Sequence, residues 1–201
     1  MGNEMSKAIA RRITDWRYAN RWFVGTGLDV GCGYDPLQAG TLFHKIDAVT
    51  GYDNVLGSGD AQYLSEIADN TYDFLVSAHC LEHMHNPAES LKNWLRVVKP
   101  GGFLTITVPE YDLYEHRHWP SRFNGDHKWS WTMKNELNND RPAHVLYVPM
   151  WLVMMQADTG YPFDIEMMQL LTEHFDFSLG DMVDQTGGPA ECAIEFVLRK
   201  N

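Results

Sequence analysis

The feature that most limits what this chain can fold into is the stretch LDVGCG at residues 28–33. Leu28 and Val30 indicate the end of a buried strand, and Gly31 and Gly33 allow the backbone to turn sharply and approach a ligand closely. A strand, a glycine-rich turn and the start of a helix form the ligand cleft of many α/β proteins, at the carboxyl ends of the strands. Taken alone, the stretch is explained equally well by a tight turn that binds nothing.

Strands and helices alternate through the next eighty residues. We predict strands at 48–53, 72–78 and 103–108, a short helix at 37–43, and a longer helix that Asn86 caps and Pro87 begins. This alternation is typical of a mostly parallel sheet that helices cover on both faces.

One unit of that alternation is missing. Asp60 lies only seven positions after Asp53, which is at the predicted tip of the second strand. A helical crossover between parallel strands needs about ten to twelve residues. The sheet is therefore predicted to lack a strand on this side.

The second half of the chain is less regular. Residues 110–149 are rich in aromatic side chains and histidine, and a long loop of this kind is usually functional. After regular structure at 150–156, we predict a helix at 165–175. Strands at 177–183 and 193–200 are predicted to follow, as an antiparallel hairpin at the sheet edge.

The first 23 residues form a separate feature. Ile9, Ile13, Trp16 and Phe23 share one stripe at helical spacing, which predicts an amphipathic helix over 4–23. The helix either docks on the body of the protein or covers the ligand cleft as a lid. Its excess of basic side chains indicates a solvated face or, alternatively, an anion-binding arm.

Composition excludes several classes of protein. A formal charge of -11 argues against a broad nucleic-acid surface, which needs clustered Lys and Arg. We find no 18-residue apolar run and no signal peptide. Three cysteines without CxxC spacing favour a reducing compartment, so we expect a cytoplasmic protein; its oligomeric state stays open.

Five blocks occur in a fixed order: LDVGCG at 28–33, GYD at 51–53, GDA at 59–61, YDFLVS with LEH at 72–83, and VKPGG at 98–102. In this order they resemble the class I S-adenosylmethionine (SAM)-dependent methyltransferases, in particular the type 11 branch. The resemblance implies a Rossmann-like three-layer α/β sandwich, a mostly parallel sheet with a C-terminal antiparallel hairpin and a shortened segment before the adenine-binding motif. It implies one domain over 1–201, with 1–23 as the lid candidate and 110–165 as an acceptor-side insertion.

The resemblance also implies a cofactor site. Gly31 and Gly33 would face the methionine part of SAM, Asp53 would hold the ribose hydroxyls, and Asp60 with the Ala61 amide would contact the adenine. The full set of implied cofactor-binding residues is Asp29, Gly31, Cys32, Gly33, Asp53, Asn54, Asp60, Ala61, Ala78 and His79. Asp35 replaces the third glycine of the first motif, so the local backbone path differs from the family pattern.

Three histidines are the catalytic candidates. In such an enzyme SAM becomes S-adenosylhomocysteine by direct in-line displacement, and a neutral histidine can take the proton of a small-molecule hydroxyl acceptor. We select His79, His83 and His127 for this task, although His83 has an equally good structural interpretation in ordering its loop. Cys32 and Cys80 are interpreted as packed residues. Six histidines raise the question of a metal, but without a Cys or carboxylate set at ligand spacing we predict none: His79, His83, His85, His116, His118 and His127.

Two other functions remain open. One is a SAM-binding partner subunit without transfer activity. The other is a nicotinamide-dependent oxidoreductase, which Pro36 disfavours because it occupies the place of the third glycine of GxGxxG. For methyl transfer itself we expect an oxygen or nitrogen atom of a small-molecule acceptor, either sugar-like or aromatic. The identity of the acceptor and the choice between O- and N-methylation are left open by the sequence.

Overall fold

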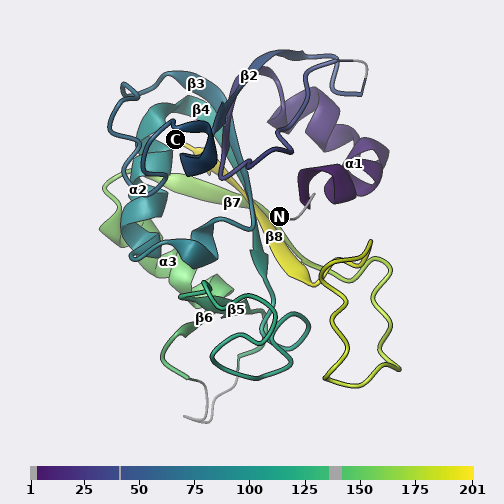
Figure 1. Ribbon diagram of the computed structural model, residues 1–201. Helices are drawn as coiled ribbons and strands as arrows, with labels where there is room; N and C mark the ends of the chain where they lie inside the picture. Colours follow the sequence, from purple (N-terminus) through teal and green to yellow (C-terminus); the bar gives the residue numbers. More distant parts are fainter. Residues whose placement is uncertain (1–3, 41, 136–141) are drawn as a thin grey trace.

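A computed structural model describes residues 4–40, 42–135 and 142–201 (Figure 1). A six-stranded sheet runs through the molecule in the order β2-β1-β3-β4-β8-β7. Its first four strands in that order are parallel, and β8 is antiparallel to both β4 and β7. The strands are β1 (Gly25–Val30), β2 (Ile46–Tyr52), β3 (Tyr72–Ala78), β4 (Val98–Pro109), β7 (Phe163–Leu171) and β8 (Ala193–Lys200).

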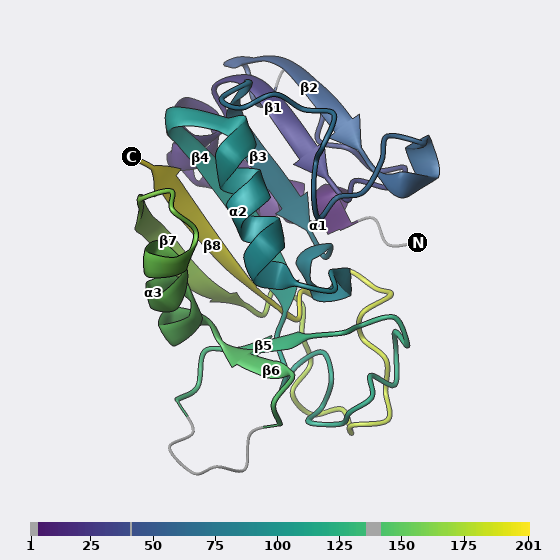
Figure 2. The ribbon, with the colours of Figure 1, turned by 90° about the vertical axis from the view of Figure 1, so that its left-hand side faces the viewer.

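Helices cover both faces of this sheet (Figure 2). On one face lie α2 (Pro87–Val97) and α3 (Val148–Asp158), and on the other lie α1 (Glu4–Thr14) and the π-helical turn η1 (Tyr18–Trp22). Successive residues of β3 alternate between the two cores, with Leu75 on the α2 side and Phe74 on the α1 side. The predicted three-layer α/β sandwich is confirmed, as is the Asn86 cap, which accepts from two amides of the first turn of α2.

The predicted gap in the sheet is also confirmed. Between β2 and β3 the chain forms only the short 3-10 helix η2 (Asn54–Leu56) and turns, so β2 is the edge strand. The segment returns directly to β3 without adding a strand.

The short helix predicted at 37–43 is wrong for the described residues. Residues 34–40 and 42–45 form turns and extended chain. The residue before a proline disfavours helical backbone, which applies to Asp35 before Pro36. The Leu37 amide donates to the Asp29 carboxylate at 2.6 Å instead of entering a helical ladder.

The helix predicted at 165–175 is wrong too. Residues 163–171 form β7, which pairs with β8 along its whole length. Met, Gln, Glu and Leu favour a helix by intrinsic propensity, but the ladder with β8 outweighs that preference. The edge hairpin therefore exists with β7 as its first strand, while residues 177–183, predicted as a strand, form turns with Phe177 71% exposed.

The N-terminal helix is shorter than predicted and turns a different face inward. It ends at Thr14 and buries Met5, Ala8 and Arg12, whereas Ile13 and Trp16 are exposed. The cause is Glu195 of β8, a buried carboxylate whose Oε2 accepts from Arg12 Nη2 at 2.6 Å. A fully buried ion pair decides the orientation of the helix in place of the apolar stripe.

The solvated-face interpretation is wrong for Arg11 and Arg12, whose side chains are 12% and 0% exposed, and holds in part for Arg17 and Arg21, at 38% and 43%. Arg11 donates to Glu191 and Glu195, and Arg21 pairs with Glu166. These pairs connect α1 to β8 and the loop before it, and η1 to β7.

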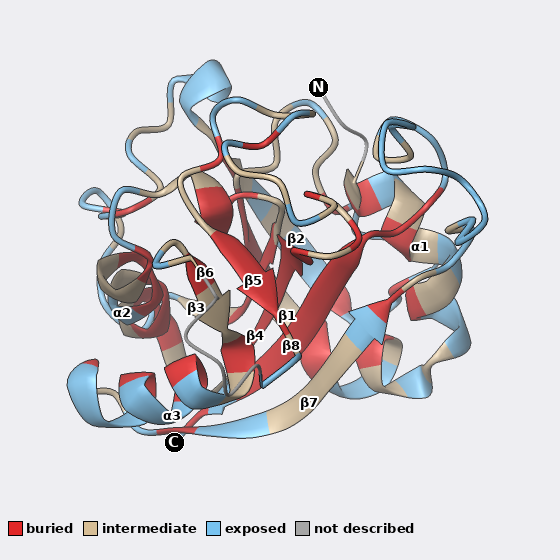
Figure 3. Ribbon diagram, turned by 90° about the horizontal axis from the view of Figure 1, so that it is seen from below, coloured by how far each residue is buried: buried red, intermediate tan, exposed pale blue. Residues whose placement is uncertain are grey.

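Two long loops lie at the carboxyl end of β4. Residues 110–129 follow β4, and residues 172–192 connect β7 to β8; Figure 2 shows both below the main sheet. Between 129 and α3, a two-stranded parallel sheet joins β5 (Ser130–Thr132) to β6 (Val145–Tyr147). Figure 3 shows β5 and β8 as buried elements and β7 as a partly exposed edge. Among the described residues, no helix has the length and apolar character that a membrane span requires.

Candidate functional site

A cavity of about 1070 Å³ opens at the carboxyl ends of β1, β2 and β3. Its walls come from the turn after β1, the end of β2, the 3-10 helix η3 (Leu81–His83), the loop after β4, the start of α1 and the tip of the 172–192 loop. The cavity is lined by every site residue that the sequence predicts: Asp29, Gly31, Cys32, Gly33, Asp53, Asn54, Asp60, Ala61, Ala78, His79, His83 and His127.

The glycine turn forms the floor of this cavity. Gly31 has φ +76°, and a Cβ there would lie 2.4 Å from the Cβ of Cys80, so only glycine fits. Gly33 has φ +52°, and nothing lies within 4 Å of where its Cβ would be. The floor is bare backbone that a ligand can approach closely.

Asp29 lies under this floor with 1% exposure. Its Oδ2 accepts from the Leu37 amide, while its buried Oδ1 has no hydrogen-bond partner among the described residues. Burial raises the pKa of Asp29 to about 7, against the opposing effects of the Leu37 amide and the charge of Arg12. An unpaired carboxylate oxygen at the edge of a cavity can accept from a cationic ligand group.

Asp53 stands at the tip of β2. Its Oδ2 accepts from the Gly33 amide at 2.8 Å, and its Oδ1 accepts from the Val55 amide at 2.8 Å. The carboxylate thereby joins the glycine turn to the neighbouring strand.

Asp60 and Ala61 line the cavity farther along the same side. Asp60 accepts from the Gln62 amide, and the Ala61 carbonyl accepts from the indole of Trp94 on α2. The turn that holds both residues is thus anchored to the helical layer.

His79 begins the other half of the cavity, directly after β3. It has φ +52°, an uncommon conformation for a residue other than glycine. Its Nδ1 lies 3.3 Å from Glu82 Oε1, and its Nε2 lies 3.7 Å from Glu4 Oε2. Burial would lower the pKa of His79, but these two carboxylates outweigh it and raise the pKa above its usual value.

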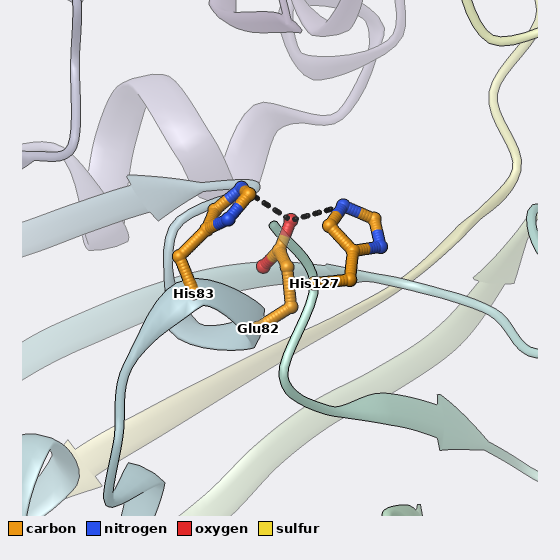
Figure 4. Close-up of side chains that lie close together, drawn as sticks. All are labelled: Glu82, His83 and His127. Carbon is orange, nitrogen blue, oxygen red and sulfur yellow. Dashed lines mark ion pairs between the residues drawn. The ribbon is translucent and has the colours of Figure 1, made fainter. Parts of the chain in front are cut away.

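Glu82 is fully buried at the centre of this group. Burial would raise the pKa of Glu82, but the contact with His79, together with the nearby His83 and His127, outweighs it and lowers the pKa. Figure 4 shows Glu82 between the imidazole rings of His83 and His127. Three histidines, His79, His83 and His127, therefore lie around one buried carboxylate.

The loop after β4 brings His127 to this place. The amides of Lys128 and Trp129 donate to the backbone carbonyl of Glu82 at 2.9 and 3.2 Å. The His127 ring is held by buried Glu115, whose Oε1 lies 2.7 Å from Nδ1.

Several lining residues were not singled out by the sequence analysis. They are Glu4, Met5, Asp35, Tyr114, Phe123, Asn124, Asp126, Thr186 and Gly187, with Glu82 cited only as part of a loop motif. The aromatic composition of 110–149 indicated Tyr114 and Phe123 only as members of a functional loop. Nothing in the local sequence identifies Glu115 as the partner of His127.

The three cysteines are free, and two of them line the cavity. Burial raises the pKa of the Cys32 thiol to about 11, and nearby Asp29 and Asp53 act in the same direction. Burial likewise raises the pKa of Cys80. Neither supplies a thiolate near neutral pH, in agreement with their interpretation as packed residues.

Comparison with known proteins gives a family and a fold. A family model described as "Methyltransferase domain" matches residues 4–149. A ubiquinone biosynthesis O-methyltransferase from Photobacterium profundum is 35% identical over 83 residues, which are 41% of this chain and 33% of that protein. Measured against this curated relative, the match spans about a third of its length.

Solved structures resemble the whole chain. A SAM-dependent methyltransferase from Archaeoglobus fulgidus superposes with a TM-score of 0.58 at 18% identity, over 100% of this chain and 95% of that one. Phosphoethanolamine N-methyltransferase 2 from Haemonchus contortus, in complex with SAM, gives 0.54 at 17% identity, over 95% of this chain and 52% of that one. These likenesses concern the fold.

Proposed function

The chain belongs to a methyltransferase domain family, and from that premise we propose that it transfers a methyl group from SAM to an oxygen or nitrogen atom of a small-molecule acceptor. The observation that carries the proposal is the continuous cavity, which has the residues implied for the cofactor at one end and three histidines at the other. The fold alone would not separate methyl transfer from other chemistry on a similar sheet.

At the cofactor end of the cavity, the residues implied for SAM have side chains and backbone groups that can bind its methionine, ribose and adenine parts. The bare backbone at Gly33 offers room for the methionine part, and the unpaired Oδ1 of Asp29 suits its ammonium group. Asp53 is placed to accept from the ribose hydroxyls, and the turn at Asp60 and Ala61 to contact the adenine. Each of these roles is a proposal for a variant to test.

Methyl transfer by direct displacement requires no covalent intermediate with the protein. SAM, when bound, supplies a methyl group on a sulfonium that is already strongly electrophilic. The chain's own task is to hold the acceptor atom in line at about 3 Å and to exclude water. Tyr114, Phe123 and Asn124 supply an acceptor wall that is part aromatic and part polar.

We propose that His79, His83 and His127 handle the acceptor. His79 lies near two carboxylates, Glu82 and Glu4, which raise its pKa above the usual value despite its burial. His127 has its Nδ1 held by Glu115, so its Nε2 faces the group formed with Glu82 and His83. His83 and His127 are therefore the better candidates for direct contact with the acceptor.

Two segments are proposed to complete a single domain over 1–201. Residues 110–165 would form the acceptor side, since five residues of this segment line the cavity: Tyr114, Phe123, Asn124, Asp126 and His127. The start of α1 would form a fixed wall rather than a swinging lid, because Arg12 is buried against β8.

The two alternatives fit less well. A partner subunit without activity would have an occluded acceptor side, whereas the cavity reaches Tyr114 and Asn124. A nicotinamide enzyme seats its pyrophosphate on the helix that follows the glycine turn. In the described part of residues 34–45 no helix follows.

A transfer assay tests the proposal. Isotope-labelled SAM is incubated with the purified protein and a panel of alcohols, phenols and amines, and label on the acceptor is counted. We expect transfer above background to at least one class, lost in Asp53→Ala. Tight SAM binding without transfer to any acceptor would favour the partner subunit, and binding of NAD in place of SAM would favour the oxidoreductase.

A further inference from the structure

We propose that Glu82, His83 and His127 form a binding site for a divalent transition-metal ion at the acceptor end of the cavity. One potential ligand atom from each residue lies within 4.8 Å of the others. The Nε2 atoms of His83 and His127 lie 4.0 and 3.9 Å from Glu82 Oε1 (Figure 4). The sequence predicts no metal because it has no Cys or carboxylate set at ligand spacing; the fold supplies the carboxylate by bringing His127 to Glu82.

The orientation of both rings suits a metal. Nδ1 of His127 lies 2.7 Å from Glu115 Oε1, and Nδ1 of His83 lies 3.1 Å from Asp126 Oδ2. An ionised carboxylate only accepts hydrogen bonds, so in a neutral ring the proton sits on Nδ1 and Nε2 presents a lone pair. Metal-binding histidines are commonly held in this way by a carboxylate behind the ring.

The front of the site is therefore rich in electron pairs. Two Nε2 lone pairs converge on one face of the Glu82 carboxylate, and Glu82 is fully buried. Its Oε2 has no hydrogen-bond partner among the described residues. The Nδ1 atom of His79 also lies 3.3 Å from Glu82 Oε1 and balances part of this charge. A divalent ion between Glu82 and the two Nε2 atoms would place positive charge on lone pairs that otherwise face a carboxylate.

The ligands are held in place before any ion binds. The Lys128 and Trp129 amides fix the His127 segment to the Glu82 backbone, and the Trp129 indole donates to the Met84 carbonyl at 3.0 Å. The Tyr114 ring packs on His127, with 4.9 Å between ring centroids. A metal about 2.1 Å from each ligand keeps ligand atoms roughly 3 to 3.5 Å apart, so closure from separations of up to 4.8 Å needs these atoms to approach by roughly 1 to 2 Å.

The donor set selects the kind of ion. Two imidazoles and one carboxylate suit zinc and its first-row neighbours, whereas magnesium and calcium prefer all-oxygen sites. Three protein ligands leave a coordination position open toward the cavity. This rests on the proposed function: an oxygen atom of the acceptor would occupy that position, so His83 and His127 would act on the acceptor through the ion instead of by direct contact. Oxygen-bearing acceptors are then the favoured class.

Metal titration tests the site without any assay of activity. Chelator-stripped full-length protein is titrated with Zn²⁺ by calorimetry, and with Co²⁺ by visible absorption, with Mg²⁺ for contrast. We expect one strong Zn²⁺ equivalent, a cobalt spectrum of a nitrogen and oxygen site, and weaker Mg²⁺ binding. His83→Gln and His127→Gln should each weaken Zn²⁺ binding at least tenfold.

His85→Gln is the matched control, since His85 is exposed two residues from His83 and does not line the cavity. His83 is only partly buried, so His83→Gln stays informative if His127→Gln fails to fold. Zn²⁺ affinity that is equal in His83→Gln, His85→Gln and the unmodified protein would overturn the site. Binding of S-adenosylhomocysteine is measured on the same samples. If the unmodified protein binds Zn²⁺ but does not bind S-adenosylhomocysteine, the proposed function alone is contradicted.

Discussion

At the scale of single residues, Asp53 connects the parts of the cofactor end. It fixes the glycine turn through the Gly33 amide and begins the next turn through the Val55 amide. These two hydrogen bonds give Asp53 a structural role in the free protein, and on the proposed function its charge would also accept from the ribose hydroxyls.

We therefore predict that Asp53→Ala weakens binding of SAM or S-adenosylhomocysteine at least tenfold, or about 1.4 kcal/mol, by loss of a charge-assisted bond pair. Asp53→Asn keeps one acceptor oxygen and should lose less. Calorimetry measures both, with Asp47→Ala, an exposed aspartate on the same strand, as control. An affinity unchanged in Asp53→Ala would remove this residue from the site.

Asp29 gives a pH dependence with a definite sign. Arg12, Asp35 and Asp53 are the charged groups that act on it, and burial dominates, raising its pKa to about 7. Between the unfolded pKa near 4 and about 7 the native state holds a proton that the unfolded state has released, so stability from this group falls as pH rises. Relative to Asp29→Asn, the free energy of unfolding should decline from pH 4 to 7 and level off above.

Urea unfolding at four pH values across that window measures the difference. A difference between the two proteins that stays constant from pH 4 to 8 would show that Asp29 titrates normally in the folded state.

Local patterns identified part of the site and not the rest. Gly31, Gly33 and Asp53 are readable from sequence because a strand end, a tight turn and a strand-tip carboxylate are local features. The approach of His127 to Glu82 depends on how a long irregular loop folds back over η3. No local pattern encodes that contact.

At the scale of elements, predictions succeeded where local signals agreed with the fold. The strand at 72–78 and the capped helix α2 follow from an apolar run and from the Asn86 and Pro87 signals. β7 was missed because its residues favour a helix in isolation and become a strand only beside β8. The buried face of α1 was predicted wrongly because Arg12 is buried in an ion pair with Glu195, which lies 183 positions away.

The packing of α1 on the sheet depends on the buried ion pair between Arg12 and Glu195. We predict that Glu195→Gln destabilises the protein by about 3 to 5 kcal/mol, because the substitution leaves Arg12 buried without its counter-charge. The carboxylates of Glu191 and Glu195 share Arg11, so part of the network survives. Combining Arg12→Met with Glu195→Leu should recover much of the loss.

Urea unfolding at pH 7 checks both variants. Arg17→Ala is the control, because its pair with Asp15 is partly exposed and should contribute no more than about 1 kcal/mol. A loss of similar size in Glu195→Gln and Arg17→Ala would mean that the buried pair does not secure the helix.

At the scale of the whole molecule, segments from distant parts of the sequence surround the cavity described above. The first helix is joined to β8 by buried charges, and the loops after β4 and before β8 meet its start at the carboxyl edge of the sheet. Segments from both ends and the middle of the sequence thus form the walls. A ligand that fills this space should stabilise the fold as a unit, by about 2.7 kcal/mol at a hundredfold excess over Kd.

The most direct test of the central claim is a crystal structure of the protein with S-adenosylhomocysteine. We predict that the ribose hydroxyls lie against Asp53, the adenine against the turn at Asp60, and the sulfur between the Gly31 turn and His79 with open space toward His127. A ligand bound elsewhere, or a cavity closed by side chains so that none binds, would contradict the assignment of this cavity to methyl transfer.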